Sequence, residues 1–311
     1  MASLKDIRRR IGSVKNTQQI TKAMKMVSAA KLRRAQDLIN GARPFADKVE
    51  ELTSRILRDL LKTKTDENQK VLHPLLRQEI VSNKEDETQK PKAYLIAVSS
   101  DKGLCGAYNT NVIKQTIKHV NLLKNKYDVK VFCAGRKISD SLRKRGFDVE
   151  TLPNFWAKPL TQSRVVAAAK SWVDDFAQGK VDLIEFSYTE FKSAISQTAR
   201  TRVILPLEVK VESVDTLGTA EAAVDKGYVF KPSREELLAS LLPKQVILQM
   251  YRCFADALAS EFGARMSSMD NATRNASDMI SDLTLLANRV RQASITTELM
   301  EIVGGAEALK G

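Results

Sequence analysis

Residues 4–60, LKDIRRRIGSVKNTQQITKAMKMVSAAKLRRAQDLINGARPFADKVEELTSRILRDL, decide the fold of this chain. Apolar or small residues recur along this stretch at steps that alternate between three and four, and polar Gln18, Lys25 and Thr53 fill the gaps in the series. The series comprises Leu4, Ile7, Ile11, Val14, Thr21, Ser28, Leu32, Ala35, Ile39, Ala42, Ala46, Val49, Ile56 and Leu60. Such a heptad seam is typical of a helix that packs along a partner helix. We therefore expect one helix roughly 85 Å long, with a kink expected at its one interior breaker, Pro44.

The other end of the chain repeats this pattern. After Pro243 no further proline occurs, and Gly263 is the only glycine before Gly304. Apolar residues again step by threes and fours, at Met250, Phe254, Leu258, Phe262, Met266, Met269, Ala272, Ala276, Ile280, Leu283, Ala287 and Val290. A helix over about 244–302 would be roughly 90 Å long, and Ser233 followed by Glu236 forms a capping box ahead of it.

Two helices of matched length with one apolar seam each bury those seams most simply against each other. The segment between them leaves and returns at the same end, so the prediction is an antiparallel two-helix coiled coil built from both chain termini. The alternative is two separate helices of a bundle. It is less favoured because the sequence predicts no third helix of comparable length.

The middle of the chain has a different character. Short apolar runs predict strands at 93–98, 129–133, 181–186 and 203–205, and helical patterns lie at 110–126, 136–145 and 161–178. Strand–helix alternation indicates a small Rossmann-like parallel sheet. The predicted division is an N-terminal coiled-coil helix over 1–62, linker loops and an α/β domain over 63–230 with its sheet core at about 93–207, and a C-terminal coiled-coil helix over 231–311.

The net charge of +13 is concentrated at the N-terminus. Residues 1–34 carry ten Lys and Arg residues against one acid, Asp6. A segment this basic favours an acidic protein partner, a nucleic acid or an anionic membrane. No apolar run approaches the roughly 20 residues that span a bilayer, so the chain is not expected to cross a membrane.

The sequence assembles no catalytic or metal site. The three cysteines are odd in number and lack metal-ligand spacing, which indicates reduced thiols. His73 and His119 are isolated and are expected at the surface. Ser99–Gly106 follows the first predicted strand, where a nucleotide-binding fold places its phosphate loop, but it matches neither G-x-G-x-x-G nor a P-loop and is interpreted as a tight turn. We expect no catalytic residue, metal, cofactor or direct small-molecule substrate.

Several blocks of the chain resemble one known family. Residues 291–306 read RQASITTELMEIVGGA and are similar to the C-terminal signature of F-type ATP synthase gamma subunits. Further similar blocks occur in the family's order, namely Lys5–Arg8 with Asn16–Val27, Ser99–Gly106 with Asn109, and Leu258–Glu261 with Ala264–Met266. The resemblance covers essentially the whole chain.

The resemblance implies a non-catalytic central rotor shaft of a bacterial F-type ATP synthase. Its coiled coil would stand inside a ring of alpha and beta subunits, three of each, with the α/β domain near the epsilon subunit and the membrane c-ring. It would couple proton or sodium flow to ATP synthesis or hydrolysis at the beta subunits, as a peripheral protein on the cytoplasmic face of the bacterial plasma membrane. The implied beta-subunit contacts are Met24, Lys25, Arg291, Gln292 and Thr296, and the implied epsilon or ring contacts are Tyr228 and Lys231.

Two departures and two rivals accompany this interpretation. Lys231 stands where family members often carry an acid, and the paired-cysteine insert of chloroplast relatives is missing after Phe191. A basic coiled-coil nucleic-acid-binding protein is the alternative suggested by a pI of about 9.6, but Phe45 is the only aromatic residue in the basic helix. A nucleotide-dependent α/β enzyme is the second rival, and it would need the phosphate loop and catalytic base that are absent here.

Overall fold

The computed structural model describes residues 3–63, 73–76, 90–194, 196–207 and 233–308. It falls into two compact units. Residues 1–30 and 265–311 form one, here called the coil unit, and residues 31–264 form the other, the sheet unit. The predicted contacts Tyr228 and Lys231 lie outside the described residues.

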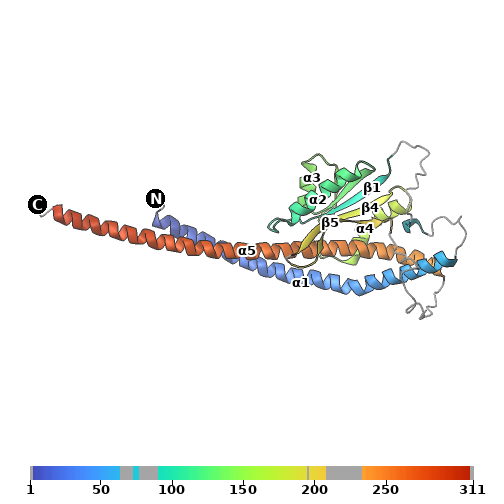
Figure 1. The fold of residues 1–311 in the computed structure, drawn as a ribbon, viewed down its shortest axis with the longest axis horizontal. Coiled ribbons are helices and arrows are strands. Elements are labelled where there is room, and N and C mark those ends of the chain that lie inside the picture. Colours follow the sequence, from blue (N-terminus) through green and yellow to red (C-terminus); the bar gives the residue numbers. More distant parts are fainter. Residues whose placement is uncertain (1–2, 64–72, 77–89, 195, 208–232, 309–311) are drawn as a thin grey trace, which may run out of the picture. The chain divides into compact units, whose positions relative to one another are not determined.

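Two helices contribute to both units, α1 (Leu4–Thr63) and α5 (Arg234–Ala308). Their presence confirms the two long helices predicted at the ends of the chain (Figure 1). In α1 the least exposed positions follow the predicted seam, including its polar members Gln18, Lys25 and Thr53. Residues 272, 276, 280, 283, 287 and 290 of α5 are likewise less exposed than most of their neighbours. Burial thus has the heptad spacing of the sequence.

Helix α5 begins earlier than predicted. The Ser233 hydroxyl accepts a hydrogen bond from the Glu236 backbone N–H at 3.1 Å, and the helix starts at Arg234 rather than near residue 244. Pro243 therefore lies inside the helix, although it removes one backbone hydrogen bond. Buried Leu238, Leu242 and Val246 lie on one face across the proline, and their burial offsets the lost hydrogen bond.

In the coil unit the two helices run antiparallel. Thr21 of α1 contacts Thr273 of α5, and Lys25 contacts Asp270, so residue numbers rise on one helix as they fall on the other. Small or polar residues, Thr21 and Ser28, are among the buried members of the α1 seam. The predicted antiparallel coiled coil is confirmed, with a partly polar interface.

The sheet unit contains one five-stranded sheet in the order β3-β2-β1-β4-β5. The strands are β1 (Lys92–Val98), β2 (Asp128–Ala134), β3 (Val149–Thr151), β4 (Leu183–Phe191) and β5 (Gln197–Leu205). Parallel pairing joins β1 to β2 and β4, and β2 to β3, whereas β5 runs antiparallel to β4. The sheet is therefore mixed rather than wholly parallel, because a short turn after Phe191 reverses the chain directly into β5.

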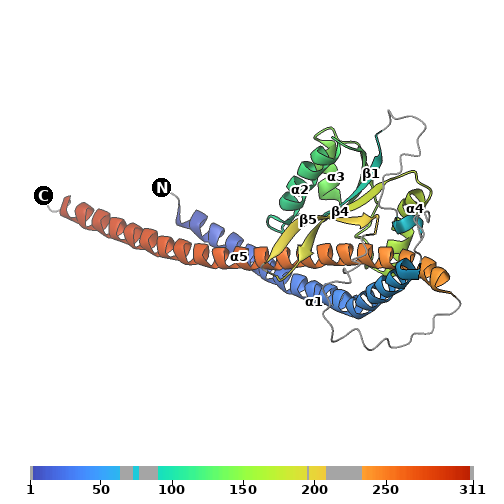
Figure 2. The same cartoon turned by 45° about the vertical axis from the view of Figure 1, so that its right-hand side comes forward.

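Helices cover both faces of this sheet (Figures 1 and 2). The helices α2 (Tyr108–Leu123) and α3 (Arg136–Arg143) lie on one face, and α4 (Gln162–Ala177) lies on the other. Alternation along β1 divides the core, since Leu95 and Ala97 pack with α2 and α3 while Ile96 and Val98 pack with α4.

The second face also receives the long helices. Ile56 of α1 and Phe254 of α5 are fully buried in the same core as α4, and the Phe254 ring lies 4.5 Å from the Phe155 ring and 5.2 Å from the Phe186 ring. A one-turn 3-10 helix, Pro74–Leu76, adds buried Leu75. The long helices are thereby anchored to the sheet by apolar burial.

None of the helices in the described ranges has the length and apolarity needed to cross a membrane.

Candidate functional site

The C-terminal end of α5 is exposed to solvent along its whole length. Every residue from Arg291 to Ala306, here called the α5 tip, is exposed. This tip includes the predicted beta-subunit contacts Arg291, Gln292 and Thr296. The Thr296 hydroxyl donates to the Gln292 carbonyl at 2.9 Å, which confirms that these two residues share one helix face. Thr296 can therefore offer a partner only an acceptor, while Gln292 and Arg291 have side-chain donors available.

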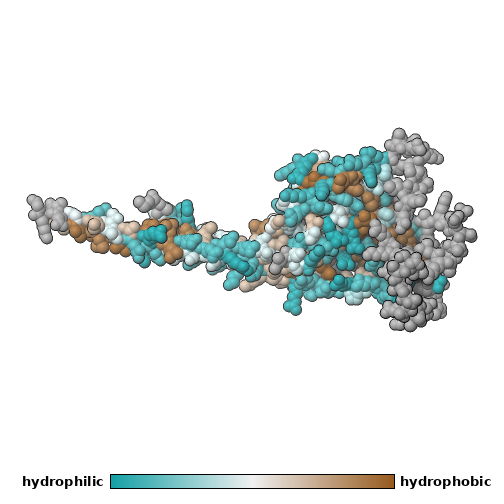
Figure 3. Space-filling view, in the orientation of Figure 1, coloured by the Kyte–Doolittle hydropathy of each residue, from teal (hydrophilic) through white to brown (hydrophobic). Residues whose placement is uncertain are grey.

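The α5 tip also carries apolar surface that the sequence interpretation missed. Ile295, Leu299, Met300, Ile302 and Val303 are between 50% and 70% exposed. Figure 3 shows hydrophobic side chains gathered along this end of α5. Single exposed apolar residues are ordinary, whereas a gathering on one segment marks an interaction surface. The seam pattern ends at Val290. The apolar residues beyond Val290 could therefore have been predicted to pack on a partner other than α1.

The basic face of α1 is the second candidate surface. Among described residues, Arg9 pairs with Asp6 at 3.3 Å, Lys25 pairs with Asp270, and Lys31 lies 5.3 Å from the centre of the Phe262 ring. The other seven bases of the first 34 residues are exposed and make no ion pair within the described part of the chain: Lys5, Arg8, Arg10, Lys15, Lys22, Arg33 and Arg34. The structure thus leaves most of this charge available to a partner.

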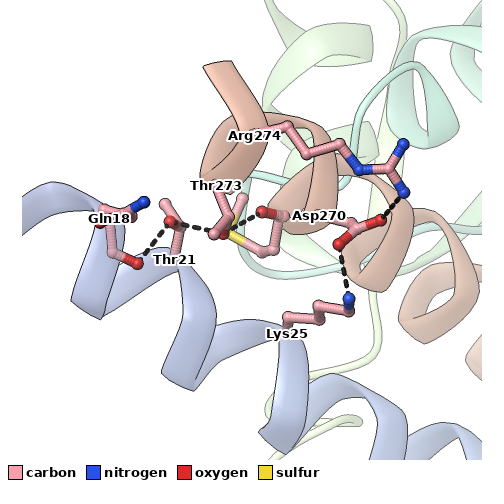
Figure 4. A network of polar contacts seen from close by, with 7 residues as sticks. Gln18, Thr21, Lys25, Asp270, Thr273 and Arg274 are labelled. Carbon is pink, nitrogen blue, oxygen red and sulfur yellow. Dashed lines mark hydrogen bonds and ion pairs between the residues drawn. The ribbon is translucent and has the colours of Figure 1, made fainter. Parts of the chain in front are cut away.

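A polar network joins the helices within the coil unit (Figure 4). The Lys25 ammonium donates to Asp270 Oδ1 at 2.5 Å, and the Arg274 guanidinium donates to Asp270 Oδ2 at 2.6 Å. One turn away, the Thr273 hydroxyl lies 2.8 Å from that of Thr21, which in turn donates to the Gln18 carbonyl at 3.0 Å. Both cations lower the pKa of Asp270, and the hydrogen bond from Lys25 is the largest cause.

This network changes the interpretation of Lys25. The sequence placed Lys25 at a gap in the apolar seam and, through the resemblance, as a contact for another subunit; the structure gives its ammonium a partner inside the chain. Asp270 and Thr273 were not singled out, because their pairing depends on the register between two helices more than 240 residues apart. Met24, the neighbouring predicted contact, is partly exposed.

The Ser99–Gly106 segment is a closed turn between β1 and α2, as interpreted from the sequence. The Ser100 hydroxyl donates to the Lys102 carbonyl at 2.6 Å, and Asn109 Oδ1 accepts from the Ser100 backbone N–H at 3.2 Å. Leu104 and Gly106 have positive φ values of 64° and 55°. The Ser100 backbone N–H is thus bound by Asn109 of α2 and the Lys102 carbonyl by Ser100, so neither group is open to a ligand.

A pocket of about 500 Å³ lies in the sheet unit between α1, the end of β4 and α5. It is lined by Arg33 and Arg43 of α1, Glu190 of β4, and Tyr251 and Asp256 of α5, among others. Asp256 is only 6% exposed, and no described residue donates a hydrogen bond to its carboxylate or forms an ion pair with it. Burial raises its pKa to about 6, and the nearby Arg252 opposes that shift.

Other reactive side chains are held in structural roles. Within the described ranges, no group of three or more His, Cys, Asp or Glu residues could hold a metal ion. Cys105, Cys133 and Cys253 are free thiols and all are buried. The histidines are less exposed than predicted, because His73 Nδ1 accepts from the Leu75 backbone N–H and His119 pairs with Glu185, a buried residue of β4.

Comparison with known proteins gives matches over the whole length. A protein-family model described as ATP synthase matches residues 3–309. The ATP synthase gamma chain of Anaeromyxobacter sp. strain Fw109-5 is 42% identical over 311 residues, and that of Bdellovibrio bacteriovorus is 39% identical over 312 residues; each match covers 100% of both chains.

Solved structures share the fold at lower identity. A chain of the Euglena gracilis mitochondrial ATP synthase, in a structure of OSCP, F1 and the c-ring, superposes with a TM-score of 0.60 at 19% identity, covering 98% of this chain and 94% of that one. A chain from the central stalk and c-ring of the Tetrahymena thermophila mitochondrial ATP synthase gives 0.53 at 22% identity, covering 81% and 99%. At this identity the likeness supports the fold alone.

Proposed function

The chain belongs to the ATP synthase gamma-chain family, and we propose that it is the central rotor shaft of a bacterial F-type ATP synthase. The observation that carries the proposal is identity of 39–42% to bacterial gamma chains along the entire length. In this role the chain is a non-catalytic subunit. It couples proton or sodium flow through the membrane c-ring to ATP synthesis or hydrolysis at the beta subunits.

The shaft acts through its asymmetry. Chemically identical catalytic sites differ in nucleotide affinity only if something touches each of them differently. In this two-helix coil, α1 is strongly basic and α5 ends in an apolar tip. The coil therefore presents a different surface in each direction. Rotation carries these contacts from one beta subunit to the next and shifts the affinity of each in turn.

The contacts with the beta subunits are placed at two levels of the shaft. Met24 and Lys25 form the first, within a helix whose charge suits acidic loops. Arg291, Gln292 and Thr296 form the second, where Arg291 supplies a charge-assisted hydrogen bond and Gln292 an amide donor. Exposure of all three tip residues and the shared face of Gln292 and Thr296 support this second level.

The remaining partners and the location extend the same proposal. The alpha subunits surround the shaft with the beta subunits, and Tyr228 and Lys231 contact the epsilon subunit or the c-ring. The protein is peripheral, on the cytoplasmic face of the bacterial plasma membrane. The division into a helix over 1–62, a middle region over 63–230 and a helix over 231–311 belongs to this proposal too.

Reconstitution tests the function. Alpha and beta subunits are assembled with and without this chain, joined to membranes that carry the c-ring, and assayed for ATP-driven ion pumping. We expect pumping only when the chain is present. Stable binding of the free chain to duplex DNA, with no association to alpha and beta subunits, would instead favour the nucleic-acid alternative.

A further inference from the structure

Among the described bases of residues 1–34, Lys25 has an anionic partner on the opposite helix of the coil, whereas the ion pair of Arg9 with Asp6 lies within α1. Its ammonium lies 2.5 Å from Asp270 Oδ1, and the second oxygen of that carboxylate accepts from Arg274 at 2.6 Å. Eight of the ten bases in residues 1–34 make no ion pair with another described residue. Asp270 therefore binds one specific cation of α1, which is then less available to a partner outside the coil.

The pair is placed where it can open. The Lys25 side chain is 44% exposed and that of Asp270 is 24% exposed, and ion pairs in contact with water hold together only weakly. The register of the helices does not depend on the pair alone, because the Thr21 and Thr273 hydroxyls lie 2.8 Å apart one turn away. Lys25 can thus leave Asp270 and extend outward while the coil stays in place, and Arg274 still neutralises the carboxylate it leaves.

We propose that Asp270 is a positioning residue that holds Lys25 within the coil and thereby limits the contact of this cation with acidic side chains of the surrounding catalytic ring. The inference rests on the proposed function as the rotor shaft. An acidic side chain of the ring competes with Asp270 for the same ammonium. Lys25 is then a weak and reversible contact that allows the shaft to move on, whereas an unpaired lysine would bind in one rotational position and slow departure from it.

The test uses the reconstituted complex and a set of matched variants. Asp270→Asn keeps the size of the side chain and removes its charge, which frees Lys25. ATP-driven turnover should fall by no more than about fivefold, because an ion pair in contact with water has only a small effect. Lys25→Gln alone gives the reference rate of a shaft that lacks this cation. The double variant Lys25→Gln with Asp270→Asn should recover that rate, because the freed cation is gone.

Two further variants separate positioning from simple support of the coil. Asp270→Glu retains the carboxylate and should keep turnover near normal. Arg274→Gln combined with Asp270→Asn should remain slow, because Arg274 is not the cation that is held back. Turnover of the double Lys25→Gln, Asp270→Asn variant that is clearly slower than that of Lys25→Gln alone would overturn the inference and assign Asp270 to coil stability. Normal turnover of Asp270→Asn would overturn it as well. Failure of the proposed function would differ from both, because the unaltered chain would then support no ATP-driven pumping.

Discussion

Replacing Asp256 with Asn should stabilise the protein at neutral pH. Asp256 is a carboxylic acid at the wall of the pocket between α1, β4 and α5, it is 6% exposed, and it has no hydrogen-bond donor among the described residues. A buried carboxylate without donors loses its hydration and gains little in return. The amide of Asn has nearly the same shape and carries no charge.

The magnitude follows from the pKa. Burial raises the pKa of Asp256 from 3.8 to about 6. The folded state therefore binds this proton more tightly than the unfolded state, and stability falls as pH rises through the interval between those two values. Each pKa unit corresponds to about 1.36 kcal/mol, so ionisation costs the folded state about 3 kcal/mol at pH 8 and about 1.6 kcal/mol at pH 5. Below about pH 4 the cost is nearly absent.

Urea unfolding of the full chain, followed by circular dichroism between about pH 5 and pH 8, measures this difference. The free energy of unfolding of Asp256→Asn should exceed that of the unaltered chain by up to about 3 kcal/mol at pH 8, with a smaller gap at pH 5. Asp37 lines the same pocket but is exposed, so Asp37→Asn should change stability by no more than about 0.5 kcal/mol at any pH. An Asp256→Asn variant no more stable than the unaltered chain at pH 8 would refute the reasoning, since the carboxylate would then have a compensating partner.

Three other expectations concern the proposed function. Replacing Arg291, Gln292 and Thr296 together by Ala should lower ATP-driven turnover about tenfold or more if paired donors worth about 1.5–3 kcal/mol are lost; circular dichroism should stay unchanged because Ala favours helix. Replacing Asp278, Asp282 and Arg289 by Ala is the matched control. Equal turnover in the two sets would mean that Arg291, Gln292 and Thr296 make no contact that matters for turnover. Met24→Lys adds a cation that is not held back by Asp270, so ion pumping per ATP hydrolysed should fall while the complex stays intact; unchanged pumping would contradict the contact at this level. The isolated chain should show no heat of ATP binding in calorimetry, because the Ser99–Gly106 turn matches neither phosphate-loop motif, and stoichiometric binding would contradict this expectation.

The coiled coil could be predicted from the sequence because its signal is periodic. A seam repeated over many turns specifies which face is buried even where individual members such as Thr21, Lys25 and Ser28 are polar. Position along the seam does not specify which residue of α1 meets which residue of α5. The contact of Lys25 with Asp270 required the structure for that reason.

Less of the sheet than of the coiled coil could be predicted from the sequence. Buried β1 appears in the sequence as a continuous apolar run, as is usual for strands covered on both faces, and β2 appears as an apolar run interrupted by Lys130. In contrast, β3 has only three residues, and the first half of β5 carries polar Gln197, Thr198 and Arg200. In sequence, neither segment can be distinguished from a loop. The antiparallel direction of β5 depends on the turn after Phe191, where the Ser193 hydroxyl accepts from the Ser196 backbone N–H at 2.9 Å.

The functional surfaces depend on a partner and are correspondingly hard to locate from one chain. Arg291, Gln292 and Thr296 are ordinary helix surface by composition, and only the resemblance singled them out. The apolar residues around them are a signal of another kind, because Leu299, Met300 and Ile302 are not covered by any described part of the chain. Asp256 gave no sequence signal, since burial of one acid within an apolar helix face appears only when the sheet and both long helices are assembled.

The two edges of the sheet bear on how the free subunit avoids self-association. A strand with open backbone groups on one side is a template onto which another chain can add. Here β3 and β5 are the outer strands of the described sheet. The first has only three residues, and the second carries Arg202, whose charge would meet that of an identical strand laid beside it. We therefore expect that a newly made chain does not aggregate through edge-to-edge pairing of its sheet before it assembles with its partners.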